Sequence, residues 1–320
     1  MKRFLVIQTA FIGDVILATS IVEKLHQFYP ESSIDFLLRK GNEGLLQSHP
    51  IINELIVWDK KNKKLDNLKA VTKKVKNTNY DVVINLHRFA SSGLITSLSG
   101  AKDKRGFKKN PLSLSFTQKF AHQIGDGTHE IERNHQLIED LTDSTPSKPK
   151  LYPSKEDYEN VSKYKEQSYI CMAPTSVWFT KQLPQEQWVK LIEKLGDQQI
   201  IYLLGGPDDV VQCENIKELA KNKQVVNLAG KLSFLESAAL MDDAQMNYVN
   251  DSGPLHIASA MNAPVTAYFC STVPSFGFGP LSDNSTIVET KEELACKPCG
   301  LHGHKECPEG HFDCGFKIVV

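Results

Sequence analysis

The sequence predicts an α/β protein made of two similar halves, each with a parallel β-sheet covered by helices. Short apolar runs of strand length alternate with helical stretches along the chain, which is typical of parallel sheets with crossover helices. The alternation stops in a Pro-, Ser-, Thr- and Lys-containing segment at 143–157 and then begins again. With 320 residues, the chain has the length of two ordinary domains. We therefore expect domains at 1–150 and 151–320.

The individual elements follow from the spacing of apolar residues. In the first half we expect strands at 4–8, 34–38, 56–58 and 81–86, and helices at 14–28 and 62–77. In the second half we expect strands at 169–173, 200–204, 225–228, 246–249 and 265–269, with helices at 185–196 and 233–243. Open sheets of this kind bind ligands at the carboxyl ends of their strands, so two in tandem predict a ligand between them.

Charge and composition exclude several classes of protein. A formal net charge of -1 argues against nucleic acid as the main partner. The apolar run after Met1-Lys2-Arg3 is too short to be a secretory signal or a membrane span. Three cysteines are scattered singly and four cluster near the end, which suits a reducing compartment. We expect a cytoplasmic protein.

The segment Asn250–Ala260 is the most informative one, because it follows a strand and opens a helix. Ser252 or Gly253 can cap this helix, and Pro254 suits its first turn. Backbone N–H groups at such a helix start form a site for an anion such as a diphosphate. His256 can donate to a phosphate or simply pack. A capped, buried helix without any ligand explains the same residues equally well.

Two more loops after strands carry polar side chains. The loop 173–184 offers the hydroxyls of Thr175, Ser176 and Thr180 and the cation Lys181, which can stabilise a departing diphosphate. Taken alone, Lys181 is more often a solvated surface lysine. Asp208 and Asp209 follow a Gly-Gly-Pro sequence and can accept hydrogen bonds from a ribose, although a plain turn explains them nearly as well.

In the first half, Asp14 ends the loop between the first strand and the first helix. It can act as a general base toward an acceptor hydroxyl, or it can cap the helix. A helix N-terminus lowers the pKa of a carboxylate and burial raises it, so the sequence leaves both roles open. The glycine-rich and nucleophile motifs of dinucleotide oxidoreductases, P-loop kinases and serine hydrolases are absent.

Four segments in sequence order together resemble glycosyltransferase family nine, the lipopolysaccharide heptosyltransferases. They are Phe4–Asp14, Thr180–Pro184, Asn227–Ser233 and Asn250–His256, and the resemblance extends over nearly the whole chain. It implies two Rossmann-like domains facing across a cleft, the glycosyltransferase B architecture. The implied reaction is an inverting, metal-independent transfer of heptose from ADP-heptose to a lipopolysaccharide inner-core acceptor, with no cofactor besides the nucleotide-sugar donor.

The resemblance also implies residue roles. Asp14 would be the catalytic base, and Lys181 would stabilise the leaving diphosphate. The first domain would bind the acceptor and the second the donor. The implied donor-binding residues are Thr175, Ser176, Thr180, Asp208, Asp209, Gly230, Lys231, Asp251, Ser252, Gly253, Pro254, Leu255 and His256.

The acceptor side is less well defined. Expected acceptor contacts are Gly13, His87, Arg88 and Arg105. The basic clusters Lys60–Lys64 and Lys102–Lys109 either meet an acidic, lipid-linked acceptor or are solvated lysine faces. Contact with the inner face of the cytoplasmic membrane is consistent with such an acceptor.

The cysteine-rich tail at 296–314 leaves three chemical states open. Cys296, Cys299, Cys307 and Cys314 can bind a structural zinc, stay reduced or form a disulfide. Two other functions also remain open at this point: a sugar-nucleotide epimerase of the same architecture, and a non-catalytic protein that docks a partner through this tail.

Overall fold

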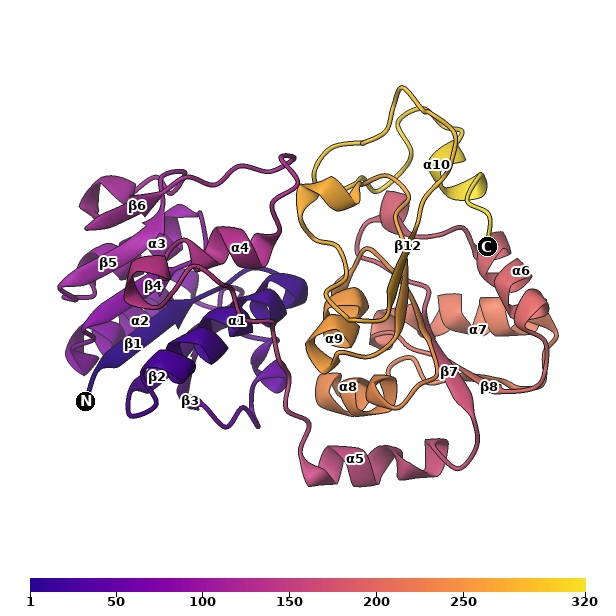
Figure 1. Ribbon diagram of the computed structural model, residues 1–320, viewed down its shortest axis with the longest axis horizontal. Helices are drawn as coiled ribbons and strands as arrows, with labels where there is room; N and C mark the ends of the chain where they lie inside the picture. Colours follow the sequence, from indigo (N-terminus) through magenta and orange to yellow (C-terminus); the bar gives the residue numbers. More distant parts are fainter. The chain divides into compact units, whose positions relative to one another are not determined.

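The computed structural model describes residues 1–320, and the chain forms two compact units (Figure 1). The first unit contains Met1–Ile124 and Thr128–Tyr152, and the second contains Gly125–Gly127 and Pro153–Val320. The main division, between Tyr152 and Pro153, lies two residues beyond the expected boundary. Every helix is too short or too polar to cross a membrane.

The first unit is built on a parallel six-stranded sheet in the order β3-β2-β1-β4-β5-β6. Its strands are β1 (Arg3–Ile7), β2 (Ser33–Arg39), β3 (Ile52–Trp58), β4 (Val82–Asn85), β5 (Asp103–Phe107) and β6 (Gln118–Phe120). Its helices are α1 (Ile12–Phe28), α2 (Lys64–Thr78), α3 (Ala90–Leu98) and α4 (Glu130–His135). Helix α1 packs with α4, and α2 packs with α3.

Strand β1 lies at the centre of this sheet because its side chains are apolar on both faces. Phe4, Leu5, Val6 and Ile7 are all buried, and Phe4 pairs with Ile34 of β2 and with Val82 of β4. The chain runs outward through β2 and β3 on one side of β1 and through β4, β5 and β6 on the other. The loops after β1 and β4 therefore flank a topological switch point, where open α/β sheets bind ligands.

The second unit repeats this plan with the order β12-β11-β10-β7-β8-β9. Its strands are β7 (Tyr169–Ala173), β8 (Ile200–Leu203), β9 (Val225–Asn227), β10 (Asn247–Asn250), β11 (Val265–Tyr268) and β12 (Ser285–Val288). Its helices are α5 (Lys155–Val161), α6 (Gln185–Leu195), α7 (Val210–Ala220), α8 (Phe234–Asp242), α9 (Gly253–Met261) and α10 (Asp313–Phe316). The switch point lies between β7 and β10, where Asn247 pairs with Cys171.

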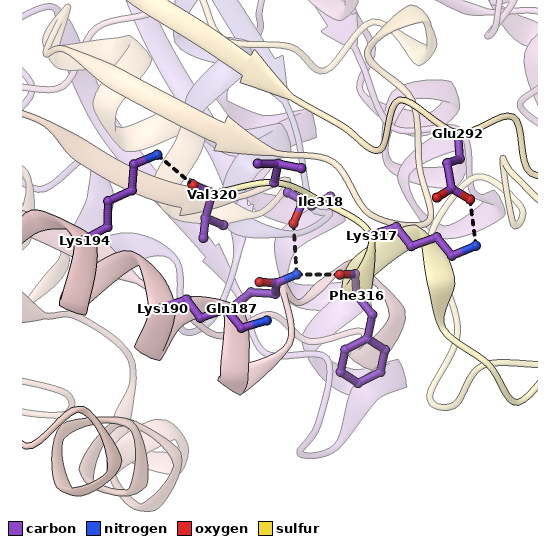
Figure 2. Close-up of a pocket in the computed structure, with 9 residues that line it drawn as sticks. Gln187, Lys190, Lys194, Glu292, Phe316, Lys317, Ile318 and Val320 are labelled. Atoms are coloured by element: carbon purple, nitrogen blue, oxygen red, sulfur yellow. Dashed lines mark hydrogen bonds and ion pairs between the residues drawn. The ribbon is translucent and has the colours of Figure 1, made fainter.

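The end of the chain is part of the core of the second unit. Ile318 is buried in the cluster that includes Trp188 and Ile192 of α6. The Gln187 side chain donates to the Ile318 carbonyl at 2.9 Å, and Lys194 Nζ donates to the Val320 carbonyl at 2.8 Å. Figure 2 shows these bonds between α6 and the last residues.

The α/β fold class with two Rossmann-like units is confirmed, as are the expected strands and helices of both halves. The expected elements did not include the strands β5, β6 and β12 or the helices α3, α4, α7 and α10. The expected linker at 143–157 is partly wrong, because helix α5 begins within it at Lys155. Ser154 caps this helix by accepting from the Asp157 N–H at 3.2 Å, a signal that the prolines of the segment obscured.

Candidate active site

The loop after β1 places Asp14 in the first turn of α1. Its carboxylate accepts a hydrogen bond from the Phe11 N–H at 3.2 Å, so the expected capping role is present. Burial, with a smaller contribution from the nearby Glu130 carboxylate, nevertheless raises the pKa of Asp14 to about 6. The half-buried carboxyl is therefore a cap and also a stronger base than an ordinary aspartate.

A chain of titratable side chains, most of them buried, lies near Asp14. Arg88 Nη1 and His122 Nδ1 are 3.2 Å apart, and His122 Nε2 lies 3.2 Å from Glu130. Glu130, which is 5% exposed, also accepts from Arg133 Nε at 2.8 Å. Sequence analysis identified only Arg88 of this group. The others lie after the last strand of the sheet or in α4, where no strand-end rule points to them.

The loops after β1, β3 and β4 meet around Thr9. Its hydroxyl and His87 Nδ1 are 2.9 Å apart, and Lys60 Nζ donates to the Thr9 carbonyl at 2.7 Å. Burial lowers the pKa of Lys60 to about 8. Burial and the nearby Lys60 charge lower the pKa of His87 to about 3, so its imidazole is neutral near pH 7. Within the expected cluster Lys60–Lys64, Lys60 is directed into this loop, and the other lysines are exposed.

The structure gives Arg105 a role within the fold rather than at an acceptor site. Its side chain is 3% exposed. The guanidinium pairs with Asp103 at 2.7 Å and donates to Asp140 Oδ2 at 3.0 Å and to the Leu137 carbonyl at 3.0 Å. These bonds tie β5 to the segment after α4. Gly13, by contrast, lies beside Asp14 in the first turn of α1, as its expected contact with an acceptor would require.

In the second unit, Lys181 and Asp251 form an ion pair at the switch point. Lys181 Nζ lies 2.8 Å from Asp251 Oδ2, and the same oxygen accepts from the Thr272 hydroxyl at 2.6 Å. Asp251 is 5% exposed, and the Lys181 side chain is 16% exposed. Lys181 is thus a partly buried cation and not a solvated surface lysine. Thr272 was not among the expected site residues, although it follows the expected strand at 265–269.

The start of α9 adds backbone donors beside this pair. Ser252 is the N-cap and makes no capping hydrogen bond with its side chain, and its Oγ is buried without a hydrogen-bond partner. Gly253 and Pro254 form the first helical positions, and Leu255 and His256 are buried behind them. Since buried hydroxyls normally find partners, an unused hydroxyl at a helix N-terminus is consistent with an anion site.

Hydrogen bonds from the last residue of β10 and from within the loop after β7 hold the segment that carries Lys181. Asn250 Oδ1 accepts from the Leu183 N–H at 2.8 Å, and the Ser176 carbonyl accepts from Gln182 Nε2 at 2.7 Å. Thr175 is buried and Ser176 is half-buried in the same loop. Thr180 is also buried, and its hydroxyl accepts from the His304 N–H at 2.7 Å, so it is bonded within the protein.

The loops after β8 and β9 lie together at the same edge of the sheet. The Gly230 N–H donates to the Gly205 carbonyl at 2.9 Å, and Gly230 has a φ of +71°, which glycine adopts without strain. Asp209 Oδ2 accepts from the Gly206 N–H at 2.7 Å. Asp208 is exposed, which makes it the better placed of the two expected ribose contacts. Lys231, also exposed, donates to the Asn227 carbonyl at 2.8 Å.

The cysteine-rich tail contains free thiols. No three His, Cys, Asp or Glu side chains come together in a way that could hold a metal ion, whereas the clustering of four cysteines had suggested a structural zinc as one of three states. Cys314 is buried, and burial raises its pKa to about 11.

One surface pocket lies apart from the expected site residues (Figure 2). It is lined by α6 and the end of the chain, including Gln187, Lys190 and Phe316. Two of its cations already have partners: Lys317 pairs with Glu292 at 2.6 Å, and Lys194 bonds the last carbonyl. The candidate site therefore remains at the loops that follow the strands of the two sheets, and not at this pocket.

Comparison with known proteins agrees with this geometry. The model of glycosyltransferase family 9 (heptosyltransferase) matches residues 68–311. Lipopolysaccharide heptosyltransferase 3 of Escherichia coli K12 is 30% identical over 278 residues, which cover 81% of this chain and 80% of that protein. Lipopolysaccharide heptosyltransferase 1 of Campylobacter coli is 24% identical, with 91% of this chain and 90% of that protein covered.

A solved structure supports the fold. A family 9 glycosyltransferase from Veillonella parvula superposes with a TM-score of 0.80 at 23% identity, covering 89% of this chain and 85% of that one. From the family match and the Escherichia coli relative together, we conclude that this chain is a sugar-transferring enzyme and belongs to glycosyltransferase family 9, the heptosyltransferases.

Proposed function

We propose that this enzyme transfers heptose from ADP-heptose to an inner-core acceptor of lipopolysaccharide, with inversion at the anomeric carbon. The observation that carries the proposal is the Lys181–Asp251–Thr272 cluster beside the start of α9. A cation, a helix N-terminus and an unused buried hydroxyl together suit a diphosphate. A heptosyltransferase of E. coli solved with ADP has the same fold, with a TM-score of 0.73 at 20% identity over 89% of this chain and 92% of that one.

In this proposal the reaction is a single displacement, in which Asp14 acts on the attacking hydroxyl and Lys181 on the leaving diphosphate. The acceptor hydroxyl forms a bond to the anomeric carbon of the donor, and its proton passes to the Asp14 carboxylate. The bond between that carbon and the phosphate oxygen breaks, and ADP leaves with the electron pair. Lys181 and the N–H groups of α9 stabilise the charge on the departing diphosphate. A pKa of about 6 for Asp14 keeps it mainly ionised and able to accept a proton near neutral pH.

The remaining groups are proposed to bind the two substrates. Asp208 accepts from the ribose, and Gly230 lets the loops after β8 and β9 approach each other around the donor. Arg88 and the neutral His87 meet the anionic acceptor beside Asp14, and Lys60 contributes a further positive charge.

The direct test supplies purified protein with ADP-heptose and a core lipid that lacks the added heptose. We expect ADP release and an acceptor heavier by one heptosyl unit. D14N should bind ADP but lose turnover, whereas Asp66→Asn, at an exposed first-turn position of α2, should retain activity. Conversion of ADP-heptose without acceptor would instead identify an epimerase, and full biological activity of D14N would identify a non-catalytic role.

We also propose that the first unit works against the anionic inner face of the cytoplasmic membrane, where a lipid-linked acceptor would reside. Leu94 and Leu98 on α3 are exposed, and Leu114 is 90% exposed. The segment that carries Leu114 lies along α3, since Asn110 donates to the Phe89 carbonyl at 3.0 Å. Lys108, Lys109 and Lys119 are exposed nearby. Exposed leucines together with lysines suit an anionic bilayer surface.

Sedimentation with lipid vesicles tests this surface. The protein should bind vesicles that contain phosphatidylglycerol, and less so at high salt. Leu114→Glu should weaken this binding, whereas Leu219→Glu, at an exposed leucine on α7, should not. Equal binding to neutral phosphatidylcholine vesicles, or no effect of Leu114→Glu, would contradict the proposed surface.

A further inference from the structure

The cysteine-rich tail contacts the two segments that supply the partners of Asp251. Lys181 directly follows Thr180, and Thr272 directly follows Ser271. Thr180 and Ser271 are 1% exposed and bond each other twice: the Ser271 hydroxyl donates to Thr180 Oγ1 at 3.1 Å, and the Ser271 N–H donates to the Thr180 carbonyl at 3.2 Å. The two segments thus form one unit behind the ion pair.

The tail completes this unit from the other side. The His304 N–H donates to Thr180 Oγ1 at 2.7 Å, and the Thr180 N–H donates to the His304 carbonyl at 3.1 Å. The Cys299 N–H donates to the Ser271 carbonyl at 2.7 Å. Thr180 therefore has its N–H, its carbonyl and its hydroxyl all bonded, and two of these three groups bond the tail.

At Gly303 the backbone of the tail lies close against Thr180 and Lys181. A Cβ atom at this position would lie 2.9 Å from Thr180 Oγ1 and 3.0 Å from Lys181 Cγ. Both distances are at or below the limit of ordinary packing, and the φ of Gly303 is +76°. Phe312, further along the tail, packs against Phe179 with ring centroids 5.1 Å apart. The tail therefore contacts each residue of the turn Phe179–Lys181, although Phe179 stays partly exposed.

We propose that the tail segment 299–304 is a positioning element of the donor site, which acts through Thr180 and Ser271 to hold Lys181 and Thr272 on Asp251. This inference rests on the proposed role of Lys181 toward the diphosphate. Lysine is a flexible point charge on a long stem, so its contribution to leaving-group stabilisation depends on a fixed backbone. Small displacements of such groups cost up to about 100-fold in rate.

Thr180 variants test the proposal. Thr180→Val keeps the shape but removes the hydroxyl, and we expect kcat for heptose transfer to fall by about 10- to 100-fold with little change in KM for the acceptor. Thr180→Ser keeps the hydroxyl and should restore most of the rate. In a Lys181→Ala background, Thr180→Val should cause almost no further loss, because both changes remove the same contribution. Independent, multiplying losses would overturn the proposal.

Two glycines of the tail provide a matched comparison. Gly303→Ala should reduce kcat, whereas Gly310→Ala should not, because Gly310 has a similar φ of +74° but open space around it. Equal effects of the two changes would show that only backbone strain matters and would overturn the proposal.

The transferase activities of the wild type and of Thr180→Val show whether the proposed function or only the positioning role fails. A wild-type protein without transferase activity refutes the proposed function. An active wild type with a fully active Thr180→Val variant refutes only the positioning role. Hydrogen exchange of the amides at 179–182, measured without any donor, reports the bonds to the tail directly, and we expect faster exchange in Thr180→Val.

Discussion

Opposing effects set the pKa of Asp14, which caps α1 and is the proposed catalytic base. The hydrogen bond from the Phe11 N–H and the nearby Arg88 favour the carboxylate, whereas burial and Glu130 favour the neutral acid. Burial is the largest of these effects, and the resulting pKa of about 6 lies close to neutral pH. The sequence showed the helix position but not the burial, because Glu130 and the groups that enclose Asp14 come from distant parts of the chain.

The pH dependence of transfer should report this carboxyl group. A general base works only when ionised, so kcat/KM should rise with pH along a limb with an apparent pKa of about 6. Glu130→Gln removes a neighbouring negative charge and should move this limb to lower pH. Glu139→Gln, at an exposed position, serves as the control and should leave the limb in place. A limb that moves to higher pH in Glu130→Gln would contradict the assigned coupling.

Stability should also depend on pH through Asp14. Its pKa in the folded protein lies above the ordinary value of 3.8, so folding favours the protonated form. That contribution is complete below about pH 4 and is lost as the pH rises through about 6. Asp14→Asn should therefore be more stable than wild type at pH 8, on the order of 1 kcal/mol. Thermal unfolding at several pH values should show the gap closing toward pH 4, with Asp66→Asn showing no such gap.

At the scale of single elements, β5 carries Arg105, an expected acceptor contact whose guanidinium is bonded within the fold. The segment Asp103–Phe107 looks like part of a basic cluster. Its charged residues and its glycine are untypical of a strand, so β5 was not predicted. In the structure Arg105 points into the fold and bonds Asp103, Asp140 and the Leu137 carbonyl. A sequence pattern gives the charge of a side chain but not the partner that neutralises it.

Arg105 and Arg88 should therefore respond differently to substitution. Arg105→Gln leaves the Leu137 carbonyl and two carboxylates without their cation, and should destabilise the first unit by about 2–3 kcal/mol. It should not raise KM for the acceptor in protein that remains folded. Arg88→Gln should raise that KM with a smaller effect on stability. Denaturant unfolding and acceptor titration measure both effects, and the reverse pattern would restore Arg105 to the acceptor site.

The second unit was easier to anticipate because its polar residues follow strands of the expected sheet. The rule that ligands bind at strand ends pointed to the loop 173–184 and to the segment Asn250–Ala260, which carry Lys181 and Asp251, without any contact information. The tail contacts of Thr180 could not be predicted in this way, since residues 299–304 follow no strand or helix pattern. The same limit applies to the four clustered cysteines, because their place in the sequence does not show how their thiols lie in the folded tail.

At the scale of the whole molecule, each sheet has its own core, so a ligand that binds one unit should stabilise that unit more than the other. ADP should stabilise the second unit, by about 2.7 kcal/mol at a hundred times its dissociation constant. Hydrogen exchange should slow in the loops after β7 and β10, while the sheet of the first unit exchanges as before. Adenine or phosphate without ADP should give weaker protection. Protection centred on the loop after β1 would contradict the assignment of the donor to the second unit.

The attachment of the chain's last residues to α6 has a consequence for how the tail is ordered. Ile318 is buried in the core, and at the other end Lys297 Nζ donates to the Phe269 carbonyl at 3.0 Å. A loop whose two ends are already fixed loses less conformational entropy on docking than a free end does. Hydrogen bonds and the packing of Phe312 into the core can then keep it in place, and a chelator and a reducing agent added together should leave both the melting temperature and the transfer rate unchanged.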